Sequence, residues 1–249
     1  MYMKSIILAA GYATRLYPLT MNFPKPLLDV QGKTILDRLL TNLSAVPDIT
    51  EHIIVSNHKF INHFEGWKKM CNKTGCYRGT VTVLDDGSTD NDNRLGAVKD
   101  IVFAVRERNI RDDILVLAGD NVLDFPLLPF VEYQKKKGAA AIMRHEEYDT
   151  ARLQKTGVIE IGPDDLVLSM QEKPEHPKSR WAVPPFYIYP AGQLDEIPRG
   201  IEAGCFTDAP GDFTAWYCNT HPVYAWLMTG RRYDVGDLNS YTAVQKAKL

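Results

Sequence analysis

Short apolar runs alternate with segments of helical periodicity through the first half of this 249-residue chain. The apolar runs lie at residues 6–8, 52–57, 80–84 and 113–118. Between the first two runs, leucine and isoleucine recur at helical spacing over residues 35–43. Thr34 precedes this segment and suits the N-cap position of a helix. Strands that alternate with amphipathic helices form parallel βαβ units. The sequence therefore predicts an α/β protein with a doubly wound, mostly parallel, Rossmann-like sheet, in which ligands bind at the carboxyl ends of the strands.

The pattern changes in the second half of the chain. An amphipathic helix is expected at residues 130–137, and short strands separated by turns follow between residues 156 and 189. Expected strands lie at 139–143, 157–161, 166–174, 182–189 and 223–228. This arrangement predicts a small antiparallel insert on the parallel sheet. Since no repeat or linker is visible, we expect one domain over residues 1–249.

The composition excludes several classes of partner. A net charge of −2 and a pI near 6.3 argue against binding to nucleic acid or to a membrane surface, because those partners favour a marked basic excess. No apolar run approaches the roughly 18 residues that span a bilayer, and no secretory signal pattern precedes the first strand. We therefore expect a cytoplasmic protein. Its cysteines are expected to be free thiols, although Cys71 and Cys76 leave a bridge or a metal site open.

The first apolar run ends abruptly in small residues, Ala9, Ala10 and Gly11. Small residues let the backbone approach a ligand, and consecutive N–H groups in a tight turn converge on an anion. Arg15 and Lys25 add positive charge near the same loop. Many α/β proteins turn at this place for packing reasons alone, so the loop by itself indicates a phosphate site only weakly.

A second candidate site follows the apolar run at residues 113–118, which leads into Gly119, Asp120 and Asn121. A buried strand that delivers a carboxylate to its carboxyl end is a common way for α/β enzymes to present a metal ligand. A helix-capping role is the structural alternative for Asp120.

Two longer strings make the interpretation much more specific: LAAGYATRLYPLT at residues 8–20 and PKPLL at residues 24–28. Together they resemble the signature of the sugar-1-phosphate nucleotidylyltransferases, and further points of resemblance extend from Met3 to about Gln245. The resemblance implies an enzyme that transfers a nucleotidyl group from a nucleoside triphosphate, with dTTP or UTP favoured, to a sugar 1-phosphate. Pyrophosphate and a nucleotide-activated sugar would be the products. Residues 1–150 would mainly bind the nucleotide and residues 151–230 the sugar.

The resemblance also implies which residues bind the nucleotide. The residues that would contact the triphosphate lie in the first loop: Leu8, Ala10, Gly11, Tyr12, Ala13, Thr14 and Arg15. Gly96 would pack under the base. Asp85 or Asp86 stands where the family often has a glutamine that reads the base, and Arg94 lies nearby. A carboxylate accepts from a pyrimidine N3–H, from the cytosine amino group or bidentately from guanine, so the base stays open.

The resemblance also implies which residues bind the acceptor and the metal. Asp120 and Asp234 would hold Mg²⁺. The residues that would contact the sugar phosphate are Asn121, Gly157, Glu172, Lys173 and Val183. Pro184 and Pro185 replace the pair of residues that the family usually shows after Val183, which leaves the identity of the sugar open, as does Trp181.

The implied reaction needs no general base, because the attacking oxygen of a sugar 1-phosphate is already anionic. Alignment and charge neutralisation are then the main requirements. Arg15 would stabilise the departing pyrophosphate, Lys25 the α-phosphate and Lys173 the incoming sugar phosphate.

Three other functions compete with this interpretation. A cytidylyltransferase acting on another phosphorylated small molecule would keep the chemistry and change the substrates. A glycosyltransferase would typically show an Asp-x-Asp motif where Gly119-Asp120-Asn121 stands. A non-catalytic nucleotide-sugar sensor would have no need for both metal carboxylates and three cations. The sequence leaves a homo-oligomer open.

Overall fold

The computed structural model describes residues 2–75 and 77–249. The chain forms two compact units. The first unit contains Met1–Leu95, Leu117–Leu128 and Thr229–Leu249, and the second contains Gly96–Val116 and Pro129–Met228. The prediction of one domain with parts at 1–150 and 151–230 stays a prediction.

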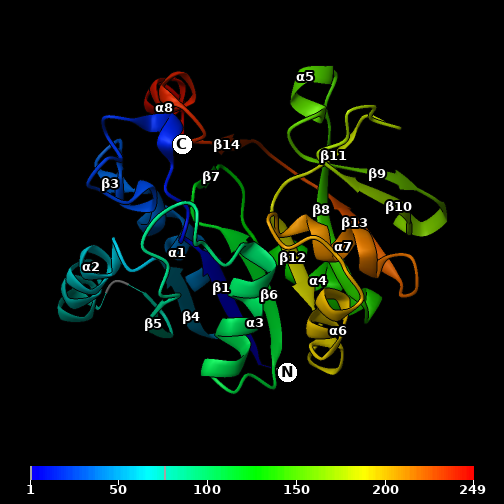
Figure 1. The fold of residues 1–249 in the computed structure, drawn as a ribbon, viewed down its shortest axis with the longest axis horizontal. Helices are drawn as coiled ribbons and strands as arrows, with labels where there is room; N and C mark the ends of the chain where they lie inside the picture. Colours follow the sequence, from blue (N-terminus) through cyan, green and yellow to red (C-terminus); the bar gives the residue numbers. More distant parts are fainter. Residues whose placement is uncertain (1, 76) are drawn as a thin grey trace. The chain divides into compact units, whose positions relative to one another are not determined.

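The first unit is an α/β structure, and Figure 1 labels most of its helices and strands. Its strands are β1 (Met3–Leu8), β2 (Asp29–Val30), β3 (Lys33–Thr34), β4 (Ile49–Ser56), β5 (Thr80–Asp85), β7 (Asn121–Leu123) and β14 (Arg232–Asp234). Its helices are α1 (Ile35–Ser44), α2 (Ile61–Thr74) and α8 (Leu238–Gln245), with short 3₁₀ turns η1 (Thr14–Leu16) and η2 (Lys25–Leu27).

Parallel pairing of β1 with β4 and of β4 with β5 gives this unit its sheet. The side chains of β4 are almost all buried, as expected for a strand covered on both faces. Helices α1 and α2 contact β4 and β5, respectively, and Thr34 caps α1 in a capping box, as the sequence predicted. The end of β6 (Asp113–Ala118) leads into this unit, where Gly119 N donates to Leu8 O at 2.9 Å. The carboxyl ends of β1, β4, β5 and β6 therefore lie at one edge.

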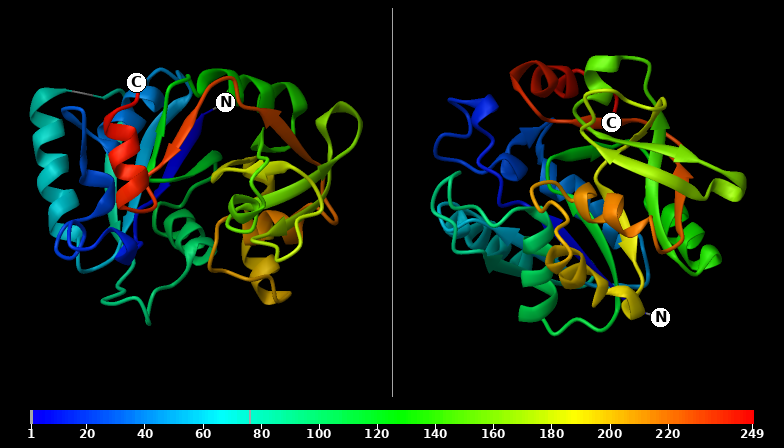
Figure 2. Two further views of the ribbon diagram at one scale, coloured as in Figure 1. Left: turned by 90° about the horizontal axis from the view of Figure 1, so that it is seen from above. Right: turned by 45° about the vertical axis from the view of Figure 1, so that its right-hand side comes forward.

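The last helix returns to the beginning of the chain. Figure 2 shows α8, in red, beside the blue segment that contains β2 and β3. Gln31 Nε2 donates to the carbonyls of Val244 and Ala247, and Tyr241 OH donates to Asp29 O. One apolar cluster joins these segments; its buried members are Leu16, Leu28, Val30, Ile35, Val122, Val235 and Val244. Because its members come from the first loop, from β7 and from the residue after β14, this cluster packs the three segments together.

The second unit contains most of the antiparallel structure. Its strands are β8 (Ala140–Glu146), β9 (Gly157–Ile161), β10 (Val167–Glu172), β11 (Trp181–Val183), β12 (Phe186–Tyr189) and β13 (Val223–Leu227), together with most of β6. Its helices are α3 (Ala97–Glu107), α4 (Leu128–Lys137), α5 (Thr150–Leu153), α6 (Glu196–Glu202) and α7 (Gly211–Tyr217), with 3₁₀ turns η3 (Pro163–Asp165) and η4 (Ala191–Gln193).

The strand order in this unit is β10-β9-β11-β8-β12-β6, and β13 pairs in parallel with β8. Strands β8 to β12 pair antiparallel, which is the predicted insert. The single strand expected at 182–189 is divided into β11 and β12. Pro184 and Pro185 cause the break, because proline has no N–H to donate to a ladder.

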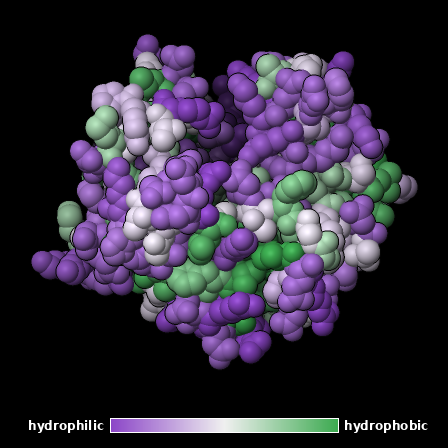
Figure 3. Space-filling model, viewed as in Figure 1, coloured by the Kyte–Doolittle hydropathy of each residue, from purple (hydrophilic) through white to green (hydrophobic). Residues whose placement is uncertain are grey.

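Hydrophilic residues cover most of the face in Figure 3, with apolar residues in smaller patches. In residues 2–75 and 77–249, none of the helices combines the length and the apolar character that crossing a bilayer requires. Cys205 and Cys218 are free thiols. Cys71 is buried, and Cys76 lies outside the described residues.

Candidate functional site

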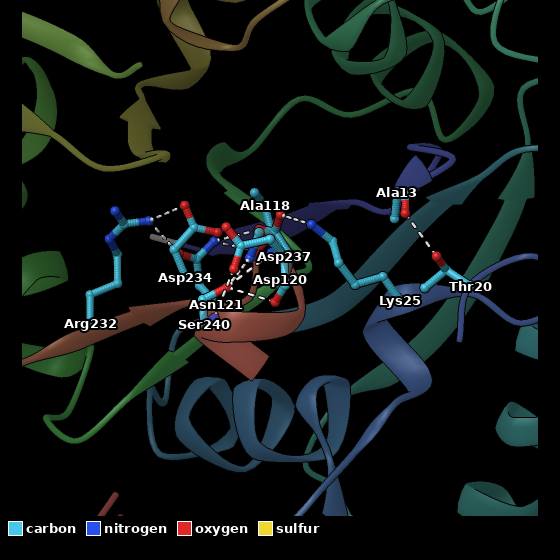
Figure 4. A network of polar contacts seen from close by, with 11 residues as sticks. Ala13, Thr20, Lys25, Ala118, Asp120, Asn121, Arg232, Asp234, Asp237 and Ser240 are labelled. Carbon is cyan, nitrogen blue, oxygen red and sulfur yellow. Dashed lines mark hydrogen bonds and ion pairs between the residues drawn. The ribbon is translucent and has the colours of Figure 1, made fainter. Parts of the chain in front are cut away.

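The loop after β1 presents unused backbone N–H groups. Within the described residues, the N–H groups of Gly11, Tyr12, Ala13 and Thr14 donate no hydrogen bond. Ala13 adopts the left-handed conformation, with φ 49° and ψ 43°. Its carbonyl accepts a hydrogen bond from Thr20 Oγ1 at 2.7 Å (Figure 4). Consecutive N–H groups around a left-handed residue form a concavity that suits an anion, so the loop has the geometry that a phosphate group needs.

The two aspartates predicted to bind a metal lie next to each other although they are far apart in the sequence. β14 pairs antiparallel with β7, and this ladder puts Asp234 opposite Asn121. Val235 N donates to Asp120 O at 3.1 Å, which fixes the next step of the ladder. Figure 4 shows the side chains of Asp120 and Asp234 in one cluster of polar contacts.

Lys25 approaches this cluster from η2. Its Nζ lies 2.5 Å from Asp120 Oδ2, and its side chain is only 15% exposed. Pro24 and Pro26 flank Lys25 and restrict its backbone. The ammonium is therefore directed at Asp120 by the fold and is not a mobile surface charge.

Arg232 holds the other side of the cluster. Its Nη1 donates to Asn121 Oδ1 at 2.7 Å and lies 3.5 Å from Asp234 Oδ2. Asn121 Nδ2 in turn donates to Asp120 Oδ1 at 2.7 Å. The Asn121 side chain, expected to contact the sugar phosphate, is fully buried and links Arg232 to Asp120.

Arg15 also lies near Asp234. A Cβ atom built on Gly236 would lie 3.8 Å from Asp234 Oδ1 and 3.9 Å from Arg15 Nη2. Arg15 is exposed, so its guanidinium can contact a ligand. Asp237, the next acidic residue, accepts from Ser240 N at 2.8 Å and caps α8.

The two carboxylates have opposite pKa shifts. Burial alone would raise the pKa of Asp120, but the charge and hydrogen bond of Lys25 and the charge of Arg232 bring it below its usual value. Burial and the neighbouring Asp120 raise the pKa of Asp234, which Arg232 only partly offsets. A second negative charge is therefore costly here, and a cation between the carboxylates would relieve it.

The donor set fits Mg²⁺. In the part of the chain that the structure describes, no group of three or more His, Cys, Asp or Glu side chains could hold a metal. Mg²⁺ is usually bound by one or two carboxylates together with substrate phosphates and water. The pair Asp120 and Asp234 provides that number of ligands, beside a loop with unused N–H groups.

The residues expected at the base lie at the end of β5 and beyond. Asp85 ends β5 and pairs with His58, with Oδ2 and Nδ1 2.6 Å apart. Asp86 follows it, and Arg94 is exposed. Gly96 has φ +93°, and a Cβ atom there would lie 2.5 Å from Thr207 O, so only glycine fits this position without a shift.

Three residues predicted to contact the sugar come together in the second unit. Gly157 begins β9, and its ladder partners are Glu172 in β10 and Val183 in β11. A Cβ atom on Gly157 would lie 3.1 Å from Glu172 Oε2 and 3.1 Å from Val183 Cβ. Met170 Cε would lie closer still, at 2.7 Å, so the backbone beside the carboxylate is packed too tightly for a side chain larger than that of glycine to fit without a shift.

Lys173 follows Glu172 in the left-handed conformation, with φ 46°. Its N–H donates to Thr156 O at 3.1 Å, and its Nζ lies 3.7 Å from Asp208 Oδ2. The Lys173 side chain is 49% exposed, so its ammonium is available to an anion.

The Glu172 carboxylate is buried with one oxygen unsatisfied. Its Oε2 has no hydrogen-bond partner among the described residues, and burial raises its pKa to about 7. A cavity of about 430 Å³ adjoins it, and Asp212, Cys205 and Trp216 are among the lining residues. A donor from a ligand, such as a sugar hydroxyl, would satisfy this oxygen.

Comparison with known proteins identifies the family of the chain. The nucleotidyl transferase family model matches residues 4–249. The chain belongs to the nucleotidyl transferase family. It is 32% identical to a glucose-1-phosphate thymidylyltransferase of Mycobacterium tuberculosis over 208 residues, which cover 80% of this chain and 65% of that protein. It is 28% identical to a glucose-1-phosphate adenylyltransferase of Fervidobacterium nodosum over 254 residues, which cover 95% of this chain and 59% of the relative.

The fold also matches that of a solved structure. A UDP-glucose pyrophosphorylase solved with UDP-glucose superimposes with a TM-score of 0.81 at 18% identity, covering 98% of this chain and 97% of that one. This confirms the predicted Rossmann-like α/β fold. The chain spans 65% and 59% of the lengths of the two curated relatives, so their activities are starting points for a proposal.

The sequence did not indicate two residues of this site. Arg232 carries no signal in the sequence beyond its place two residues before Asp234. Gly211 begins α7, and a Cβ atom there would lie 2.0 Å from Glu172 Oε2. Its contact with Glu172 depends on the packing of α7 on β10, which a local pattern does not reveal.

Proposed function

We propose that this chain transfers a nucleotidyl group from a nucleoside triphosphate to a sugar 1-phosphate and releases pyrophosphate. The observation that carries the proposal is the cluster of Asp120, Asp234 and Lys25 beside a loop with four unused N–H groups. This arrangement suits the charge neutralisation that the reaction requires.

The first unit would bind the triphosphate. The N–H groups of Gly11 to Thr14 would donate to phosphate oxygens, and Arg15 would stabilise the charge that develops on the leaving pyrophosphate. Lys25, held at Asp120, would act on the α-phosphate. Each of these groups is a donor or a fixed cation, so none has to gain or lose a proton during transfer.

Asp120 and Asp234 would hold Mg²⁺. When bound, the ion would neutralise phosphate charge and polarise the α-phosphate. Arg232 and Asn121 would keep the two carboxylates in place through the contacts described above.

Residues of the second unit would bind the acceptor. Lys173 would pair with the phosphate of the sugar phosphate, and Glu172 would accept from its hydroxyls. Gly157 would let the sugar approach the backbone, beside Val183. An anionic phosphate oxygen of the sugar 1-phosphate would attack the α-phosphorus of the triphosphate, and the bond from that phosphorus to the departing pyrophosphate would break. Because the attacking oxygen is already negatively charged, no general base is needed.

Release of pyrophosphate tests the proposal directly. The wild-type protein should release pyrophosphate when Mg²⁺, one nucleoside triphosphate and one sugar 1-phosphate are present together, and EDTA should stop the reaction. Panels of triphosphates and of phosphorylated acceptors would also separate this activity from a cytidylyltransferase acting on another acceptor. Nucleotide binding without pyrophosphate release for any pair would favour the sensor instead.

The resemblance favours dTTP or UTP as the nucleotide. The relatives are named for thymidylyl and adenylyl transfer, so membership of the family does not choose the base. The cytoplasmic location and a homo-oligomer stay predictions.

A further inference from the structure

Two adjacent aspartates at the end of β5 have different hydrogen-bond partners. The Asp85 carboxylate is fully engaged: Oδ2 pairs with His58 Nδ1 at 2.6 Å, and Oδ1 accepts from Gly87 N at 2.9 Å. Asp85 therefore has a structural role in its own loop.

Asp86 keeps one oxygen unused. Its Oδ1 accepts from both the N–H and the hydroxyl of Ser88, each at 2.7 Å. Its N–H donates to Ser56 O at 2.9 Å, which fixes the backbone. Its Oδ2 is buried and has no hydrogen-bond partner in residues 2–75 and 77–249. A buried carboxylate oxygen without a donor is unfavourable, so the oxygen is positioned for a donor from a ligand.

Tyr12 provides a second, independent observation. It lies in the loop after β1, is only 6% exposed, and packs near Phe60 with ring centroids 6.3 Å apart. Its hydroxyl is buried and makes no hydrogen bond of good geometry to any described residue, although Ser88 and Asp86 lie close to it. Two unsatisfied polar groups from separate strand ends thus lie near each other, at the edge where this unit would bind its nucleotide.

We propose that Asp86 Oδ2 recognises the base and selects one that carries an exocyclic amino group, namely cytosine, adenine or guanine, over uracil and thymine. The inference rests on the proposed function. It departs from the expectation of dTTP or UTP that follows from the resemblance alone.

The chemistry of the base edges gives the reason. An ionised carboxylate only accepts hydrogen bonds. Uracil and thymine present a single N–H between two carbonyl oxygens, so a carboxylate placed there faces lone pairs on both sides. An amino group presents donors without that repulsion. The Tyr12 hydroxyl can donate or accept, so it can pair with the ring atom next to the amino group without itself choosing the base.

Binding of triphosphates to the full chain tests this without a known acceptor. Titration calorimetry with Mg²⁺ should give a Kd for CTP, ATP or GTP at least about a hundredfold lower than for UTP and dTTP, since a site built for a hydrogen bond strongly rejects a base that lacks it. If UTP or dTTP binds most tightly, this inference fails and the proposed function stands. If no triphosphate binds, both fail.

The substitution Asp86→Asn gives a sharper test. The asparagine Oδ1 can keep both bonds from Ser88, which places its NH₂ where Oδ2 was and turns the acceptor into a donor. The preference should fall at least about tenfold and shift toward UTP and dTTP, whose carbonyl oxygens accept. Asp92→Asn removes the same charge from an exposed position in the same loop and should keep the wild-type preference. An equal shift in both variants would mean that charge alone is responsible and would overturn the role of Asp86. Should Asp86→Asn not fold, the wild-type Kd ranking still decides the proposal.

Discussion

Glu172 should make the stability of this protein depend on pH near neutrality. Burial raises its pKa to about 7 from 4.5 in an ordinary glutamate, and the nearby charges of Asp212 and Asp208 add to the shift, whereas Lys173 opposes it. The folded protein therefore holds a proton on Glu172 that the unfolded chain releases at lower pH. Stability falls as pH rises wherever the folded state binds more protons.

The size of the effect follows from the two pKa values. Below about pH 4.5 both states are protonated, and Glu172 has no influence on the difference between them. Between pH 4.5 and 7 the unfolded chain ionises while the folded chain does not. Each pH unit in this interval lowers the free energy of unfolding by about 1.4 kcal/mol. The loss is complete above pH 7 and amounts to about 3 kcal/mol.

Urea unfolding followed by circular dichroism, in wild type and in Glu172→Gln, isolates this contribution because glutamine does not titrate. The free energy of unfolding of wild type minus that of the variant should decrease by about 3 kcal/mol between pH 4.5 and pH 8. A difference that stays constant over this range would show that Glu172 has the same pKa in the folded and the unfolded chain. Burial of its carboxylate would then not raise the pKa, which would refute the reasoning.

Four further substitutions test the geometry elsewhere. Lys25→Ala and Asp120→Asn should each lower kcat for pyrophosphate release about a hundredfold, at an unchanged circular dichroism spectrum, because each removes a charged contact near the α-phosphate; normal turnover in either would remove that residue from the mechanism. Gly96→Ala should destabilise by about 1–3 kcal/mol in urea, since φ +93° and the Thr207 carbonyl at 2.5 Å both oppose a Cβ atom. An unchanged midpoint would contradict that packing. Thr34→Ala should cost about 1 kcal/mol through loss of the α1 cap, and no loss by the same measurement would mean that the capping box contributes nothing.

The sequence predicts the parallel part of the fold well because its signals are local. The strand expected at 113–118 is β6, and the helix expected behind Thr34 is α1. The division of 182–189 into two strands was missed although Pro184 and Pro185 were visible. The run of apolar residues around them indicated a strand more strongly than the two missing N–H groups indicated a break.

The candidate site was partly accessible from the sequence. Asp120 and Asp234 were singled out by motifs, and the structure brings them together through pairing of β14 with β7. The sequence could not distinguish the roles of Asp85 and Asp86, because these roles depend on their hydrogen-bond partners. His58 pairs with Asp85, and Ser88 donates to Asp86. The left-handed conformation of Ala13 was not predictable either, because alanine rarely adopts it. Hydrogen bonds from Thr20 Oγ1 and Leu16 N to the Ala13 carbonyl hold it in place.

The arrangement of charge in the first unit explains how an acidic chain can offer a site for a polyanion. The chain as a whole has a net charge of −2, yet Lys25, Arg232 and Arg15 surround two carboxylates, which leaves a formal local charge of three minus two, or +1. Without Asp120 and Asp234 these cations would repel one another, and without the cations the carboxylates could not both ionise at little cost. Each set thus holds the other in place in the folded protein. A divalent cation on the carboxylates would raise the local charge to +3 at the moment when a triphosphate needs it. The acidic residues would for this reason be as necessary to the proposed phosphate binding as the basic ones.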